Sequence, residues 1–219
     1  RQVKKSSKVW RWLAATPSIE RCIAQRVGDE RVALVPLAAA TSNTTESANS
    51  ESKYCITILD AAANPKSIQQ ILETLKTKKD IHIFVELTGC NQHKIWKLIK
   101  QLKMLDRVTC LRDISALRSL IIQSDVVLVP SKTMPVRTVL LEVMLAAIPV
   151  IAAKIDGFDM LIDEETALIT DESWEEPLQR IFEDPKLAKR IGETGSHLIS
   201  TQYASSTQIA AFEASFTLF

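Results

Sequence analysis

Short apolar runs alternate with amphipathic stretches along most of this chain. The apolar runs lack polar alternation and are rich in Ile, Val and Leu, which is typical of strands covered on both faces. They predict strands at residues 9–15, 31–36, 54–59, 81–87, 107–111, 125–129, 149–153 and 166–169. The amphipathic stretches predict helices from Thr16-Pro17 onward and at 65–78, 91–104, 114–123, 137–147, 174–183, 186–200 and 206–216. Strict alternation implies right-handed crossovers, so we expect an α/β fold with a doubly wound parallel sheet, Rossmann-like in architecture.

The same pattern divides the chain into four parts. Residues 1–37 contain one strand, one helix and one further strand, and residues 53–200 contain the repeated units of the sheet. Between them, residues 38–52 are small and polar without apolar periodicity, which predicts a linker or mobile loop. Residues 201–219 predict a C-terminal helix. The chain begins without a methionine, which predicts that it is a fragment of a longer protein.

Composition narrows the class of protein. Apolar residues make up 46% of the chain and charged residues 24%, as in folded soluble proteins. The net charge of +1 gives no indication of a nucleic-acid partner. No run is long enough to cross a membrane, and no signal peptide is present. The cysteines are widely spaced and are interpreted as reduced thiols in or near the core of a cytoplasmic protein: Cys22, Cys55, Cys90 and Cys110.

Glu142 is the one charged residue in the apolar stretch 139–147. Removing an ionised carboxylate from water costs several kcal/mol unless it finds a partner. The sequence therefore predicts a cleft or a ligand beside Glu142. The alternative is a helix whose polar side consists of Glu142 alone.

The residues around Glu142 extend this prediction. Residues 124–153 read SDVVLVPSKTMPVRTVLLEVMLAAIPVIAA. This segment resembles the nucleotide-sugar-binding segment of the family 4 retaining glycosyltransferases, also called the glycosyl transferases group 1 family. There a strand ends in Pro-Ser, a loop carries Glu-Gly-Phe-Gly, and a helix carries a second Glu. Pro130-Ser131 and Glu142 match that pattern, whereas Met134 stands at the first Glu and Pro135-Val136-Arg137 stand at Gly-Phe-Gly.

The resemblance implies a GT-B fold, with residues 1–37 as the end of the acceptor domain and the rest as the donor domain. It further implies that a hexosyl group passes from a nucleotide-diphosphate sugar to an acceptor, with retention and without a metal or other cofactor. A fragment that lacks most of the acceptor domain is expected to be inactive by itself.

By the same resemblance, Glu142 would hold the ribose hydroxyls and Lys66 the diphosphate, although the family's arginine falls on Ala61. Lys66 also fits a plain surface lysine in the first turn of a helix. Arg137 would offer a guanidinium to phosphate, or would be a solvated arginine at the start of a helix. Ser131 and Gly157 complete the donor-binding candidates. Gly157 is the one glycine left of the family's Gly-Gly-x-x-Glu turn.

Two functions of different classes follow. The first is a glycosyltransferase-like domain that binds a nucleotide sugar. The second is a catalytically degenerate GT-B domain that acts as a binding or assembly module, because Met134, Ala61 and Pro135 replace groups that the chemistry uses. An unrelated Rossmann-like binding module is a third interpretation.

The remaining polar patterns predict structure more than chemistry. The histidines have no cysteine or acid at ligand spacing, so they predict no metal site. Lysines recur every third residue along one predicted helix, at Lys94, Lys97, Lys100 and Lys103. This pattern is typical of an amphipathic surface helix, with peripheral contact to an anionic membrane as the alternative.

Overall fold

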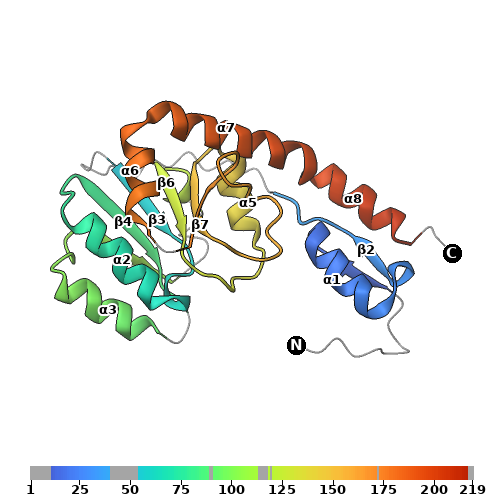
Figure 1. The fold of residues 1–219 in the computed structure, drawn as a ribbon, viewed down its shortest axis with the longest axis horizontal. Coiled ribbons are helices and arrows are strands. Elements are labelled where there is room, and N and C mark those ends of the chain that lie inside the picture. The colour runs from blue at the N-terminus through green and yellow to red at the C-terminus, as the bar shows by residue number, and fades with distance from the viewer. Residues whose placement is uncertain are drawn as a thin grey trace.

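The computed structural model describes residues 11–39, 54–88, 91–112, 118, 120–171 and 173–216, and its main domain is a six-stranded parallel sheet between helices (Figure 1). The strands are β3 (Tyr54–Ile58), β4 (Ile81–Glu86), β5 (Val108–Leu111), β6 (Val126–Val129), β7 (Val150–Ala153) and β8 (Leu168–Thr170). The helices are α2 (Pro65–Lys76), α3 (Gln92–Gln101), α5 (Thr138–Leu145), α6 (Glu175–Glu183) and α7 (Pro185–Gln202). The predicted α/β fold with a doubly wound parallel sheet is confirmed.

Three predictions fall wholly or partly outside the described residues. They are the linker at 38–52, the helix at 114–123 and the placement of Cys90. Among the residues that are described, no helix is both long enough and apolar enough to cross a bilayer.

The strand order places a topological switch point in the middle of the sheet. The order is β5-β4-β3-β6-β7-β8, and every neighbouring pair is parallel. Successive strands run outward from β3 on one side and from β6 on the other. In open α/β sheets, ligands bind outside the carboxyl ends of the strands at such a point.

Both faces of the sheet are buried, which explains the unbroken apolar runs in the sequence. Neighbouring residues of a strand point to opposite faces. Ile56 and Ile58 of β3 accordingly join one apolar cluster, together with buried residues of α2, α3 and α6. Cys55 joins a second cluster, with nearly all of α5 and with Ile199 of α7.

Helix α2 shows how local sequence sets the elements. Asn64 caps the helix, since its side-chain oxygen accepts from the backbone N–H of Ser67 at 3.3 Å, and Pro65 occupies the first helical position. Helical spacing then brings one stripe of side chains onto the sheet, where all are fully buried: Ile68, Ile71, Leu72 and Leu75.

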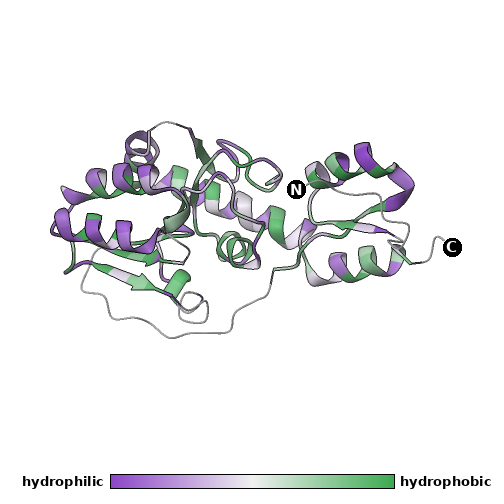
Figure 2. Cartoon of the chain, turned by 90° about the horizontal axis from the view of Figure 1, so that it is seen from below, coloured by the Kyte–Doolittle hydropathy of each residue, from purple (hydrophilic) through white to green (hydrophobic). Residues whose placement is uncertain are grey.

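The predicted strand–helix–strand unit at the start of the chain forms a small lobe (Figure 2). It consists of β1 (Trp12–Ala14), α1 (Pro17–Val27) and β2 (Val32–Leu34), and β1 and β2 pair in parallel. Thr16 caps α1, as predicted. The prediction that all cysteines lie in or near the core is wrong for Cys22, which is exposed on α1, because its place in the sequence does not reveal which side of the helix it takes.

The small lobe is held against the main domain at its helix N-terminus. Ser18 donates from its backbone N–H to Asp159 Oδ2 at 2.8 Å, and its hydroxyl also bonds the Asp159 carboxylate. The Thr16 hydroxyl donates to the backbone oxygen of Gly157 at 2.9 Å. Helix α8 (Ser205–Ala214) reaches the lobe from α7, and Arg11 donates to the backbone oxygen of Ser215 at 2.9 Å.

The contact between α7 and α5 depends on a residue without a side chain. A Cβ atom at Gly192 would lie 2.0 Å from the backbone oxygen of Ala147, whereas one at Gly195 would lie 3.4 Å from its nearest neighbour. We therefore expect Gly192→Ala to lower the free energy of unfolding by about 1–3 kcal/mol. The matched variant Gly195→Ala should raise it by up to about 1 kcal/mol, because alanine favours helix. Urea denaturation measures both, and equal effects would contradict the tight crossing.

The contact between the lobes predicts a dependence of stability on pH. Burial raises the pKa of Asp159, but the hydrogen bonds from Ser18 and Thr16 outweigh it, so the pKa lies below its ordinary 3.8. A lowered carboxyl pKa adds stability above the unfolded pKa, and this is lost as pH falls through the folded one. We expect Asp159→Asn to lose this acid-dependent part of the stability in pH-dependent denaturation, and the exposed neighbour variant Asp156→Asn to keep it. Identical acid profiles for Asp159→Asn and the unmodified chain would rule the contact out as the cause.

Candidate functional site

The loops that follow β3 and β6 meet at the switch point, where we place the candidate site. Asn64 joins them, because its side-chain amide donates to the backbone oxygen of Pro130 at 3.1 Å. Asp60 follows β3 in a left-handed conformation, with φ of 49°, and its side chain is hydrogen-bonded to Ser131. Burial raises the pKa of Asp60, and the nearby Glu86 carboxylate raises it further. Ser131, in the loop after β6, is fully buried.

A forked ion pair crosses this site. Arg137 donates through both terminal nitrogens to the two carboxylate oxygens of Glu86, each at 2.7 Å. Glu86 Oε2 also accepts from the backbone N–H of Asp60 at 2.8 Å. The side chains of Glu86 and Arg137 are only 4% and 20% exposed. The hydrogen bonds to Glu86 raise the pKa of Arg137. The prediction of a solvated arginine at the start of α5 is therefore wrong, because a buried acid holds the guanidinium.

A second forked pair holds Glu142. Arg118 donates to both oxygens of the Glu142 carboxylate at 3.0 Å, and also to the hydroxyl of Thr138 at 3.1 Å. The Glu142 side chain is 7% exposed and that of Arg118 is 44% exposed. Glu142 thus meets the partner that a buried carboxylate requires, and that partner is a protein side chain. A carboxylate offers about four acceptor positions, so two stay available after this fork forms.

The other candidates lie along the same edge of the sheet. Lys66 is exposed in the first turn of α2, directly after the loop that follows β3. Gly157 lies after β7 with φ of 86°, and its backbone oxygen is bonded to Thr16 of the small lobe. Lys66 and Ser131 follow β3 and β6, the strands at the switch point, and Arg137 and Glu142 follow Ser131 at the start of α5 and within it. Gly157 borders a separate cavity of about 600 Å³, lined by residues between 154 and 171.

The two replaced positions are built into the core. Met134 is 4% exposed and packs in the apolar cluster under α5. Ala61 is fully buried in a short 3₁₀ turn, Ala61–Ala63, and packs in the cluster under α2. Neither position can supply a charge or a strong hydrogen bond to a ligand.

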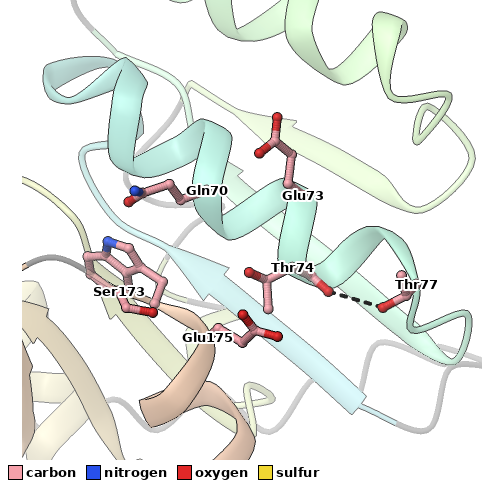
Figure 3. Close-up of a pocket in the computed structure, with 7 residues that line it drawn as sticks. Gln70, Glu73, Thr74, Thr77, Ser173 and Glu175 are labelled. Atoms are coloured by element: carbon pink, nitrogen blue, oxygen red, sulfur yellow. Dashed lines mark hydrogen bonds between the residues drawn. The ribbon is translucent and has the colours of Figure 1, made fainter.

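A polar groove of about 400 Å³ lies away from this edge, between α2 and the start of α6 (Figure 3). It is lined along α2 by Gln70, Glu73, Thr74 and Thr77, and Thr77 donates its hydroxyl to the backbone oxygen of Thr74 at 3.3 Å. Trp174 forms part of its wall, is 3% exposed and packs in the apolar cluster under α2 and α6. The α2 residues of this groove belong to the later turns of the helix, whereas the first turn of α2 adjoins the carboxyl ends of the strands. The groove and the candidate site therefore lie toward opposite ends of α2.

Comparison with known proteins decides the family. Residues 42–198 match the model of the family described as Glycosyl transferases group 1, and this range includes every strand that ends at the candidate site. The chain belongs to this family. The predicted resemblance is thereby confirmed. The α-D-kanosaminyltransferase of Streptomyces kanamyceticus is 26% identical over 144 residues, which cover 63% of this chain and 37% of that protein.

Solved structures share the fold of this group 1 chain. Sucrose-phosphate synthase from Thermosynechococcus elongatus matches with a TM-score of 0.73 and 19% identity, over 92% of this chain and 56% of its own. Anabaena HepE in complex with UDP-glucose matches with a TM-score of 0.75 and 16% identity, over 94% and 63%. The C-terminal domain of LpcC from Francisella tularensis matches with a TM-score of 0.62 and 20% identity, over 76% of this chain and all of that domain. The chain thus spans less than two thirds of the kanosaminyltransferase, the synthase and HepE.

Two residues of the site were missed by analysis of the sequence, namely Glu86 and Arg118. Glu86 carries the same signal as Glu142, a single acid inside an apolar run, here residues 81–87. That signal could have found it. Arg118 lies in a segment of mixed polarity, and nothing in its local sequence indicates a partner 24 residues away.

The Arg118–Glu142 pair leads to a test of why Glu142 is tolerated. Replacing Arg118 by Met leaves a carboxylate that is 7% exposed without its fork. We expect Arg118→Met to lower the free energy of unfolding by about 1–2 kcal/mol, at the lower end for a buried pair because the guanidinium is partly solvated.

The double variant Arg118→Met with Glu142→Leu should recover most of this loss, because it removes both charges. Thermal or urea denaturation of the single and double variants measures it. A double variant as unstable as the single one would show that the pair does not act as a unit.

Proposed function

We propose that this chain is the donor-binding part of a group 1 glycosyltransferase and binds a nucleotide-diphosphate sugar at the switch point, for hexosyl transfer to an acceptor. Family membership supports the class of reaction. The main support for placing the ligand at the switch point is the position of Lys66. It is an exposed cation in the first turn of α2, at the carboxyl end of β3, where the positive end of the helix dipole also favours phosphate.

In this proposal each group has a separate task. Lys66 faces the diphosphate and neutralises part of the charge that develops as the sugar departs. Glu142 accepts from ribose hydroxyls through the lone pairs that Arg118 does not use. Ser131 fixes the loop after β6 through Asp60. Gly157, with φ of 86°, allows the turn after β7 at the neighbouring cavity. HepE, which shares the fold, has been solved with UDP-glucose, and this supports a donor of that class.

The second candidate is a degenerate domain that keeps the fold for binding or assembly. It is favoured by the two forks, which already engage both Arg137 and Glu142, and by the buried Met134 and Ala61. Enzymes of this type act chiefly by positioning and charge neutralisation. Because Arg137 and Glu142 are engaged in internal ion pairs, they are less able to position a donor or to neutralise its charge.

Nucleotide binding tests the proposal. Thermal denaturation of the chain with UDP, GDP and ADP should show stabilisation by one of them, by about 2.7 kcal/mol at a hundredfold excess over Kd. Lys66→Met should weaken this binding several-fold without changing the stability of the unliganded chain, since the side chain is exposed.

Lys186 provides a matched control. It is an exposed lysine directly after the proline that starts α7, just as Lys66 follows the proline that starts α2. Lys186→Met should leave nucleotide binding unchanged. A folded chain that no nucleotide stabilises would overturn the proposal in favour of the degenerate domain, and equal losses for both lysine variants would remove Lys66 from the site.

A further inference from the structure

The Glu86–Arg137 fork lies across the place where a ligand of this fold would sit. Strands β4 and β6 flank β3 in the sheet. Glu86 is the last residue of β4, and Arg137 follows β6 at the N-cap position of α5. The fork therefore joins the two neighbours of β3 and passes the carboxyl end of β3, where Asp60 adds its backbone N–H to the same carboxylate.

The charged side chains around the fork carry a net negative charge, which disfavours the binding of an anion. Two carboxylates, those of Asp60 and Glu86, lie close to one guanidinium, that of Arg137, and the three act on one another electrostatically. Both terminal nitrogens of Arg137 are engaged at 2.7 Å by Glu86. A diphosphate that approaches Arg137 has to share or displace this carboxylate, and meets a like charge in doing so.

The burial of the pair makes this competition strong. Glu86 is 3% exposed and the Arg137 side chain 20% exposed, so water screens the charges of this pair poorly. The fork geometry of a guanidinium suits a carboxylate and a phosphate equally well. Glu86 and a phosphate group therefore seek the same donor atoms.

We propose that Glu86 is an affinity-determining residue of the site, an internal competitor that occupies Arg137 and weakens the binding of the diphosphate of a nucleotide ligand. This inference rests on the proposed function for the identity of the ligand. The inference goes beyond the proposed function because it assigns control of nucleotide affinity to Glu86, which binds the Arg137 guanidinium from the end of β4. Removing the charge of Glu86 frees Arg137 for phosphate.

The test is Glu86→Gln, which keeps the shape of the side chain and an acceptor for the Asp60 N–H. Binding of UDP and of uridine is measured by calorimetry on the unmodified chain, on Glu86→Gln and on the double variant Glu86→Gln with Arg137→Met. We expect Glu86→Gln to bind UDP on the order of tenfold more tightly, the effect of removing one nearby like charge, with uridine unchanged. The double variant should lose the gain.

The outcomes separate this inference from the proposed function. If the unmodified chain binds UDP and Glu86→Gln binds it equally or less tightly, Glu86 positions Arg137 instead of competing for it, and the inference fails while the proposed function stands. If only Glu86→Gln binds UDP, the inference stands and the unmodified chain is not a nucleotide binder.

Binding by neither protein overturns both proposals. An equal gain for uridine would also overturn the inference, because the effect would not depend on phosphate. Thermal denaturation confirms that each variant is folded, and Glu86→Ala, in which water can replace the carboxylate, serves as the second variant if Glu86→Gln melts below the assay temperature.

Discussion

A carboxylate that is removed from water requires a cationic partner, and this constraint organises the edge of the sheet at which the candidate site lies. Glu86 and Glu142 both stand within apolar runs, and each is held by a forked arginine from a distant part of the chain. The two pairs tie β4, the loop after β6, α5 and residue 118 to one another. The loops at the switch point are therefore fixed by charge as well as by apolar packing.

The fold was predictable from sequence because it depends on pattern. Runs such as residues 81–87 and 149–153 lack polar alternation, and this by itself indicates strands covered on both faces. The helix starts were equally clear, since Thr16-Pro17 and Asn64-Pro65 carry a capping side chain and a proline at the first position. In the six-stranded sheet the strand termini differ by at most two residues from their predicted places.

The site was less predictable because pairing depends on three-dimensional neighbours. The sequence identified Glu142 as a buried charge that needs a partner, but not that the partner is Arg118. It placed Arg137 correctly at the start of α5 and could not show that Glu86, 51 residues earlier, would engage it. Where several residues differ from the family motif, the neighbours of each remaining motif residue differ as well. The role of a remaining residue can then not be taken from its position in the motif.

Burial of Ala61 limits how the charge of this site can be changed. It stands where the family's arginine would fall, and it is fully buried in a 3₁₀ turn packed beneath α2. A guanidinium on a long stem cannot occupy that space unless the turn itself is rebuilt. A ligand-binding arginine at this position would therefore require a different path of the backbone, which substitution of Ala61 alone does not supply.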